Sequence, residues 1–234
     1  MHDRAGSGSG AGDTDRRGQR GERPVSYLRV KVCGITREED ALRAARHGAD
    51  AIGFVLWPGS PRSISIERAA EIARVLPPFV WKVGVFVNAS PQEIERAAGI
   101  ARLDVAQLHG DEDVERYRSL AVRIIKAIGV AGREDVEDAI ALPADVMPLV
   151  DAADRDQRGG TGRRAHWDLA AEIAKARPTI LAGGLNAENI IDAVEIVHPW
   201  GVDLSSSLED SPGVKNANKV AVFFAAVEPV RSVK

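Results

Sequence analysis

The chain has 234 residues, of which 44% are hydrophobic, and its 31 Lys and Arg oppose 34 Asp and Glu for a formal net charge of -3. Its uninterrupted apolar runs are far shorter than the about 20 residues that a membrane-spanning helix needs, and no long Lys or Arg block favours nucleic acid. The single cysteine, Cys33, excludes a disulfide scaffold and is typical of a reducing compartment. We therefore expect a cytoplasmic protein with a small-molecule partner.

Residues 1–26 differ in composition from the rest of the chain. Gly, Ser, Arg and Asp fill most of this segment, which lacks the apolar stretch of a secretory signal. Its apolar members are few: Met1, Ala5, Ala11 and Val25. Such a segment cannot bury enough apolar surface to offset the entropy of ordering it. We expect a disordered extension at 1–26 and one catalytic or binding domain at 27–234.

Eight short apolar runs, rich in β-branched residues, recur along 27–234 at intervals of roughly 19 to 33 residues, the spacing of strand–helix units. The runs are Leu28–Val32, Ala51–Val55, Trp81–Val87, Val105–Leu108, Ile124–Ile128, Val146–Val150, Thr179–Leu181 and Gly201–Leu204. Most are continuous rather than alternating, which is typical of strands covered on both faces.

A stretch with helical spacing of apolar residues follows each run. These stretches are Arg37–His47, Ile66–Val75, Pro91–Ile100, Asp111–Leu120, Glu134–Leu142, His166–Ala176, Asn189–Val197 and Asn216–Val227. Thr36 and Glu39 match a capping box at the start of the first helix, and Gly48 fits its end. Ser90 followed by Pro91 fits an N-cap with Pro at the first helical position. Eight such units predict a single (β/α)8 TIM barrel, with an open doubly wound sheet as the alternative.

In a barrel of this kind, the loops that follow the strands carry the chemistry. Small residues follow the seventh and eighth runs, namely Gly183 and Gly184 and then Ser205, Ser206 and Ser207. Backbone N–H groups and hydroxyls in such loops can bind a phosphate. The alternative is two tight turns, but their occurrence together at these two positions favours phosphate binding.

Two candidate catalytic groups also lie at predicted strand ends. Cys33 ends the first run, shortly before a helix whose dipole would favour the thiolate, although a free buried cysteine is often an inert core residue. Asp151 ends the sixth run, where partial burial would suit a general acid, although an Asx-turn or a helix cap would also explain it. Together they form a candidate acid–base pair for proton transfer next to a carbonyl or an imine.

Other polar positions at the same end are more ambiguous. Arg62 could bind a carboxylate or a phosphate, or it could be a solvated loop residue. His109 could orient a ligand or only hydrogen-bond the barrel rim, and Trp57 is the tryptophan best placed to touch a ligand. The polar, glycine-rich stretch 152–165 fits a mobile lid. The histidines show no metal-ligand spacing.

At these residues the sequence resembles phosphoribosylanthranilate isomerases of tryptophan biosynthesis. The resemblance runs in order from about residue 29 to 228. It rests on KVCGIT at 31–36, GFVLWP at 53–58, SPRSIS at 60–65, GVFVN at 84–88, QLHG at 107–110, LVD at 149–151, GGTG at 159–162, LAGGLN at 181–186 and VDLSS at 202–206, followed by Glu209 and SPG at 211–213.

The resemblance implies an Amadori rearrangement of N-(5-phosphoribosyl)anthranilate, without metal or organic cofactor. It makes Asp151 the general acid that opens the ribose ring and Cys33 the general base that removes the C2 proton. Arg62 would meet the anthranilate carboxylate, and Asp203 would lie near the sugar. The ribosyl phosphate would bind at Gly183, Gly184, Ser205, Ser206 and Ser207. The family often has Gly where Ser207 stands, and a Cβ there restricts the backbone.

Two alternatives differ in the residues they require. Indole-3-glycerol phosphate synthase needs lysines at strand ends, whereas Lys31, Lys82 and Lys126 lie inside predicted strands. A non-catalytic barrel that binds a phosphate ligand would need the glycine and serine loops but not Cys33 together with Asp151. The sequence leaves open whether the chain is a monomer or a homodimer.

Overall fold

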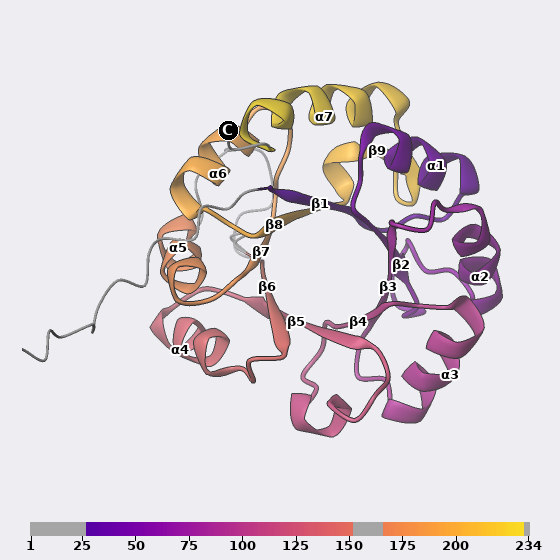
Figure 1. The fold of residues 1–234 in the computed structure, drawn as a ribbon, viewed down its shortest axis with the longest axis horizontal. Helices are drawn as coiled ribbons and strands as arrows, with labels where there is room; N and C mark the ends of the chain where they lie inside the picture. The colour runs from indigo at the N-terminus through magenta and orange to yellow at the C-terminus, as the bar shows by residue number, and fades with distance from the viewer. Residues whose placement is uncertain (1–26, 152–165, 232–234) are drawn as a thin grey trace, which may run out of the picture.

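A computed structural model describes residues 27–151 and 166–231, and eight parallel strands in it close into a barrel, in the order β1 to β8 with β8 beside β1 (Figure 1). The strands are β1 Arg29–Val32, β2 Ala51–Val55, β3 Trp81–Phe86, β4 Val105–Leu108, β5 Arg123–Gly129, β6 Val146–Asp151, β7 Ile180–Ala182 and β8 Gly201–Leu204. The predicted TIM barrel is confirmed, and the open sheet is wrong. The predicted extension at 1–26 and the predicted lid at 152–165 lie outside the described residues.

Helices surround the barrel (Figure 1). They are α1 Glu38–His47, α2 Ile66–Val75, α3 Pro91–Ala101, α4 Arg133–Ala141, α5 Trp167–Ala176, α6 Ile190–Val197 and α7 Ala217–Arg231. Two short 3-10 helices, η1 Val114–Tyr117 and η2 Ser206–Leu208, and an antiparallel hairpin of β9 Glu209–Ser211 and β10 Val214–Lys215 complete the described elements. No helix in the two described ranges is long and apolar enough to cross a bilayer.

The helix predicted at 111–120 is wrong, because only η1 forms between β4 and β5. The carboxylate of Glu112 accepts hydrogen bonds from the backbone N–H of Asn88 and of Gly110, which holds this stretch as a loop. Val114 and Tyr117, three residues apart, are buried. This spacing matches the three residues per turn of a 3-10 helix.

The capping box predicted at Thr36 is also wrong, because α1 begins at Glu38 with Arg37 as its N-cap. The Thr36 hydroxyl instead donates to the carbonyl of Gly213, in the turn of the β9–β10 hairpin. Local signals elsewhere are confirmed. Gly48 ends α1 with a left-handed φ of 100°, and Ser90 forms a capping box ahead of Pro91 at the start of α3.

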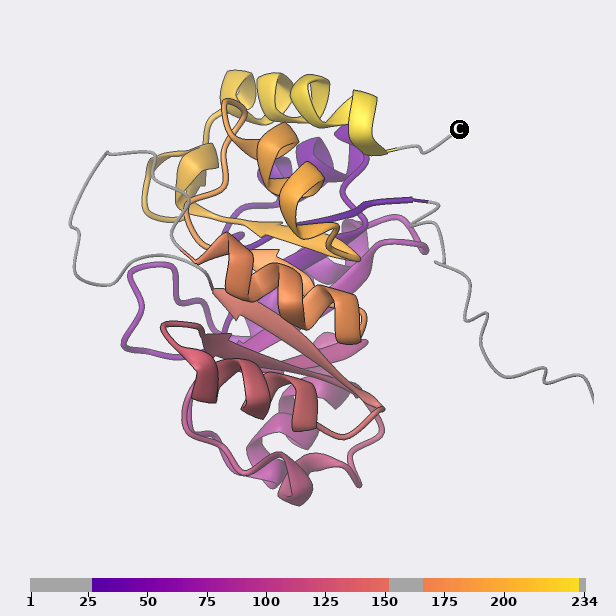
Figure 2. The same ribbon diagram turned by 90° about the vertical axis from the view of Figure 1, so that its left-hand side faces the viewer.

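Apolar side chains form two separate clusters, one between the barrel and its helices and one inside the barrel. The inner cluster consists of Val83, Val105, Ile125, Leu149, Ile180 and Ala182. In Figure 2, β1 starts at the right and the strands run toward the left, so the loops that follow the strands lie at the left. The inner cluster separates these loops from the end at which the strands begin.

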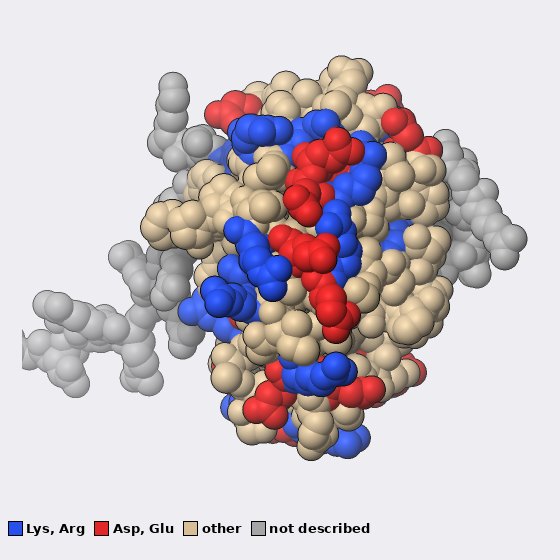
Figure 3. Space-filling view, turned by 90° about the vertical axis from the view of Figure 1, so that its right-hand side faces the viewer, with Lys and Arg blue, Asp and Glu red and all other residues tan. Residues whose placement is uncertain are grey.

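The face that carries α1, α2 and α3 is covered by interleaved acidic and basic side chains (Figure 3). Arg68 illustrates the pattern, since its guanidinium contacts Glu38 of α1 at 3.0 Å and Glu71 of its own helix at 2.7 Å. Exposed pairs of this kind contribute little to stability. Charges of both signs on this face do not form a basic patch for a polyanion.

Candidate active site

Cys33 lies at the carboxyl end of β1, and its backbone forms hydrogen bonds with the end of β8 and the loop that follows it. Its side chain is buried, with 8% of its surface exposed. Its backbone N–H donates to the carbonyl of Leu204 at 2.8 Å, and its own carbonyl accepts from the Ser205 hydroxyl at 3.2 Å. The candidate base and one of the candidate phosphate-binding serines therefore share one corner of the barrel mouth.

An ion pair lies next to the thiol, inside the barrel. Lys31 Nζ and Asp203 Oδ1 are 2.8 Å apart, and both side chains are largely buried. The two residues are register partners on β1 and β8. Asp203, predicted near the sugar, thus has one carboxylate oxygen bonded to the protein itself.

Burial is the main reason why the pKa of Cys33 is raised above its ordinary value, and the positive charge of Lys31 partly opposes this effect. The helix dipole was expected to favour the thiolate. However, α1 begins only at Glu38, and its first turn carries three acidic residues. Burial thus leaves the pKa of Cys33 above its ordinary value, opposite to the expectation, and the positive charge of Lys31 is the strongest influence in favour of the thiolate.

Arg62, from the loop between β2 and α2, reaches across Gly34 to the β9–β10 hairpin. Its Nε lies 3.0 Å from both carboxylate oxygens of Glu209, and its Nη2 lies 2.6 Å from Oε2. Lys215 Nζ also contacts Glu209 Oε1 at 2.7 Å. A Cβ at Gly34 would come within 2.6 Å of Arg62 Cδ, so only glycine leaves room for this path.

Glu209 and Lys215 are site residues to which the sequence assigned no role. Burial raises the pKa of Glu209, but hydrogen bonds from Arg62 and Lys215 outweigh it and lower the pKa below its ordinary value. Lys215 Nζ also donates to the Ser205 carbonyl at 3.1 Å, which ties the hairpin to the serine loop. The sequence signal for Glu209 was its place in the resemblance, just after the serine run.

The two candidate phosphate loops are neighbours, because β7 pairs with β8. Gly183 and Gly184 have φ values of 92° and 63°, in the left-handed region that favours glycine. Ser206 opens η2, and the buried Ser207 hydroxyl has no hydrogen-bond partner among the described residues. The glycines thus have the conformation that a close backbone approach requires, while phosphate binding at these five residues remains a prediction.

His109 follows β4, and its Nδ1 lies 2.9 Å from the side-chain nitrogen of Gln107. Burial is the main cause that lowers the pKa of His109, and Lys31, Asp203 and Asp151 all perturb it through their charges. This electrostatic coupling links residues from β1, β4, β6 and β8. Asp151 is the last residue of β6 in a parallel barrel, so it lies at the same end of the barrel as Cys33, which follows β1.

The remaining sequence candidates are simpler to place. Trp57 is exposed in the loop after β2. Lys126 contacts Glu112 at 3.0 Å, and Lys82 contacts Asp104 at 2.8 Å. Within residues 27–151 and 166–231, no three His, Cys, Asp or Glu side chains gather as metal ligands.

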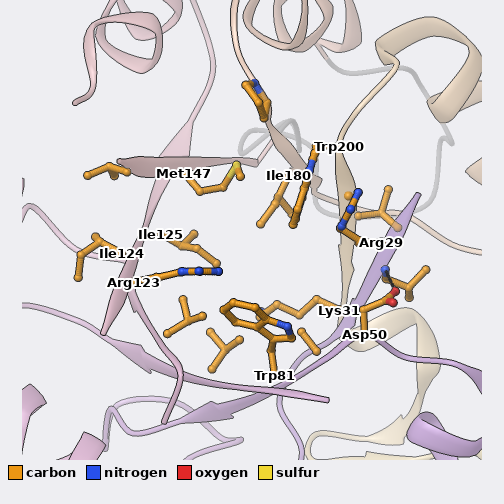
Figure 4. A pocket seen from close by; sticks show the side chains of 18 of the residues that line it. Arg29, Lys31, Asp50, Trp81, Arg123, Ile124, Ile125, Met147, Ile180 and Trp200 are labelled. Atoms are coloured by element: carbon orange, nitrogen blue, oxygen red, sulfur yellow. Dashed lines mark hydrogen bonds between the residues drawn. The ribbon is translucent and has the colours of Figure 1, made fainter. Parts of the chain in front are cut away.

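A cavity of about 520 Å³ lies at the opposite end of the barrel, where the strands begin (Figure 4). Its walls include Ile125, Met147 and Ile180, together with two tryptophans. The guanidinium of Arg29 lies 4.2 Å from the Trp200 ring centre, and that of Arg123 lies 4.6 Å from the Trp81 ring centre. Catalytic groups of this fold lie at the other end, so we assign the active site to the loops around Cys33.

A closed (β/α)8 barrel with a thiol, carboxylates and an arginine at the carboxyl ends of its strands defines the class of TIM-barrel enzymes. The family described as N-(5'phosphoribosyl)anthranilate (PRA) isomerase matches residues 30–226. The chain belongs to this family, whose members are isomerases of tryptophan biosynthesis.

Relatives and solved structures agree with this assignment. The N-(5'-phosphoribosyl)anthranilate isomerase of Pelobacter propionicus is 43% identical over 205 residues, which cover 88% of this chain and 98% of the relative. The crystal structure of the Thermotoga maritima enzyme is 40% identical with a TM-score of 0.80, and the match covers 86% of this chain and 99% of that one. A phosphoribosyl anthranilate isomerase in complex with reduced 1-(o-carboxyphenylamino)-1-deoxyribulose 5-phosphate gives a TM-score of 0.77 at 40% identity, with coverage of 86% and 99%.

Proposed function

We propose that the chain converts N-(5-phosphoribosyl)anthranilate into 1-(2-carboxyphenylamino)-1-deoxyribulose 5-phosphate, with Asp151 as general acid and Cys33 as general base. The main support is that both residues lie at the carboxyl ends of their strands, β6 and β1, and therefore at the same end of the closed parallel barrel. A relative at 40% identity binds a reduced form of this product.

The proposed reaction moves protons within one molecule. Asp151 donates a proton to the furanose ring oxygen, and the C1–O bond breaks to give an open-chain iminium. This cation acidifies the proton on C2, which the thiolate of Cys33 removes to form an enolamine. Tautomerisation of the enolamine gives the ketone. Because oxidation at C2 is balanced by reduction at C1, the reaction needs no external oxidant or reductant.

The binding groups follow from the charges of the substrate. The contacts of Arg62 with Glu209 use Nε and Nη2, so we propose that Nη1 meets the anthranilate carboxylate. Asp203 would face the sugar with the oxygen that Lys31 does not hold, and His109 would line the substrate. Gly183, Gly184, Ser205, Ser206 and Ser207 would hold the phosphate through backbone and hydroxyl donors.

The test is the rate at which substrate fluorescence disappears when purified protein receives phosphoribosylanthranilate made in situ. We expect turnover with the wild type and almost none with Cys33→Ser. As a matched control, the affinity of Cys33→Ser for a reduced product analogue should stay close to that of the wild type. The reason is that the thiol transfers a proton rather than anchoring the ligand. Binding without turnover by the wild type would instead support the non-catalytic barrel.

We also infer that the chain forms a homodimer through the end of the barrel where the strands begin. Phe79, between α2 and β3, is 92% exposed at the edge of the 520 Å³ cavity. In a two-fold dimer, each Phe79 would enter the cavity of the other copy. The segment 1–26 is a poorer occupant because it contains no aromatic residue. The Thermotoga maritima isomerase is described as dimeric, in a crystal structure of monomers generated from it.

Sedimentation velocity tests this interface. The wild type should sediment as a dimer at micromolar concentration, and Phe79→Asp should shift it to the monomer because the substitution removes the aromatic ring that would fill the cavity and adds a carboxylate that must be desolvated to enter it. Val222→Asp, at an exposed apolar position of α7, is the control and should remain dimeric. A monomeric wild type, or a dimer that survives Phe79→Asp, would contradict this interface.

A further inference from the structure

The ion pair between Lys31 and Asp203 is placed to act on Cys33. Val30 and Val32 of β1 pack toward the helices, so the alternation of side chains along the strand directs Lys31 and Cys33 into the barrel. The Lys31 side chain is 4% exposed, and that of Asp203 is 11% exposed. Both charges therefore act on the thiol through the protein interior, where screening by water is weak.

Gly53 of β2 shows how close the lysine and the thiol are. A Cβ at this position would lie 2.7 Å from Cys33 Sγ and 3.2 Å from Lys31 Cε. Sγ and Cε therefore lie at most about 6 Å apart, within the range over which a neighbouring charge changes the protonation of a group. A side chain at Gly53 would therefore collide with Cys33 Sγ and crowd Lys31 Cε in their present positions.

We propose that Lys31 is a positioning residue that makes the Cys33 thiolate available as a base, and that Asp203 moderates this effect. The proposal rests on the function proposed for Cys33. Burial by itself would keep the proton on the thiol. The ammonium group supplies the missing positive charge, and the carboxylate on β8 compensates that charge when the thiol is protonated.

The directions of the pKa shifts agree with this geometry. Burial disfavours the charged lysine, yet Asp203 and Cys33 together raise the pKa of Lys31 above its ordinary value, so it stays protonated. Lys31 lowers the pKa of Cys33, and Asp203 raises it. Lys215 also acts to lower the pKa of the thiol, and Arg62 is the other cation that interacts with it.

A purely structural role would not explain the placement of this pair. Replacing a buried ion pair by apolar side chains is often neutral or stabilising, and the neighbouring interior of the barrel is built from Val, Ile and Leu. Lys82 and Asp104 form a second lysine–aspartate pair on this barrel, 2.8 Å apart, but it is more exposed and is not among the groups that shift the pKa of Cys33.

The experiment measures the rate of Cys33 alkylation by iodoacetamide against pH, without substrate. In Lys31→Met, which keeps the stem but removes the charge, the midpoint pH should rise by about one unit or more. In Asp203→Asn the midpoint should fall, because the carboxylate that opposes thiolate formation is gone while the thiolate itself keeps Lys31 protonated. Lys82→Met is the matched control and should keep the wild-type midpoint. An unchanged midpoint in Lys31→Met, with a native circular dichroism spectrum, would overturn the proposal.

If Lys31→Met does not fold, the alkylation midpoint of Asp203→Asn tests the proposal. An unchanged or raised midpoint in that variant would overturn it.

Measurements of turnover distinguish this inference from the proposed function. The limb of the kcat/KM pH profile that reports the pKa of Cys33 should move with the alkylation midpoint in each variant that retains activity. Full activity of Cys33→Ser would refute the base role, whatever the midpoints are. Loss of activity in Cys33→Ser with an immobile midpoint in Lys31→Met would refute only the role of Lys31.

Discussion

The two ends of the barrel are built by the same strands but differ in character. Where the strands begin, Trp81, Trp200 and apolar side chains surround an open cavity. Where they end, Cys33, Asp151 and Arg62 come from three different strands or loops. β1 contributes to both ends, with Arg29 at the cavity and Cys33 at the site. Strand direction therefore separates the end that holds the cavity from the end that carries the candidate catalytic residues.

The cationic side chains also have different partners at the two ends of the barrel. At the cavity, the guanidinium groups of Arg29 and Arg123 lie over tryptophan rings. At the site, Arg62 and Lys31 are held by the carboxylates of Glu209 and Asp203. A carboxylate fixes the position of a cation more tightly than a ring face does, because it forms directional, charge-assisted hydrogen bonds. Substitutions at the two ends should therefore have different consequences.

The largest expected effect is on chemistry at the end of β6. Asp151→Asn should lower kcat by roughly 10²–10⁴-fold, because the amide cannot donate the proton that opens the ring. Steady-state turnover with excess phosphoribosylanthranilate measures kcat directly. A kcat within a few-fold of the wild type would remove Asp151 from its proposed role and would weaken the contrast between the two ends.

A smaller effect, on stability alone, is expected near the other end. Ile125→Ala removes apolar atoms from the inner cluster and should reduce the free energy of unfolding by about 2 kcal/mol or more. The kcat of the folded variant should stay within about twofold, since its distant site is unaltered. Urea denaturation and turnover at low temperature provide the two measurements. A large loss of kcat in the folded variant would show that the ends are coupled.

The smallest effect concerns the acid stability of the site. Because the folded-state pKa of Glu209 is lowered, its contribution to stability is fully present above the ordinary value and is lost as the pH falls through the lowered value. The stability difference between wild type and Glu209→Gln should therefore be constant near neutrality and shrink below about pH 4.5. Urea midpoints across this range measure it. A difference that grows on acidification would contradict the ion-pair account.

Local signals explain which parts of this protein could be predicted from its sequence. The eight apolar runs predicted the strands, and Ser90 with Pro91 marked the start of α3 correctly. The helix predicted between β4 and β5 does not form, because the Glu112 carboxylate accepts hydrogen bonds from the loop after β3 as well as from its own loop. The capping box predicted at Thr36 does not form for a similar reason, since the Thr36 hydroxyl donates a hydrogen bond to a hairpin distant in the sequence. Local patterns do not reveal such competing partners.

By itself, the sequence determined the succession of eight strand–helix units and the location of Cys33 and Asp151 at strand ends, because strand and helix periodicity is set by near neighbours. Only the tertiary structure decided which charges meet. Arg62 pairs with Glu209 and Lys31 with Asp203 across most of the chain length. These contacts form only once the barrel closes and brings β8 beside β1. The physical reason is that electrostatic coupling depends on distance in space and on burial, and neither is encoded by spacing along the chain.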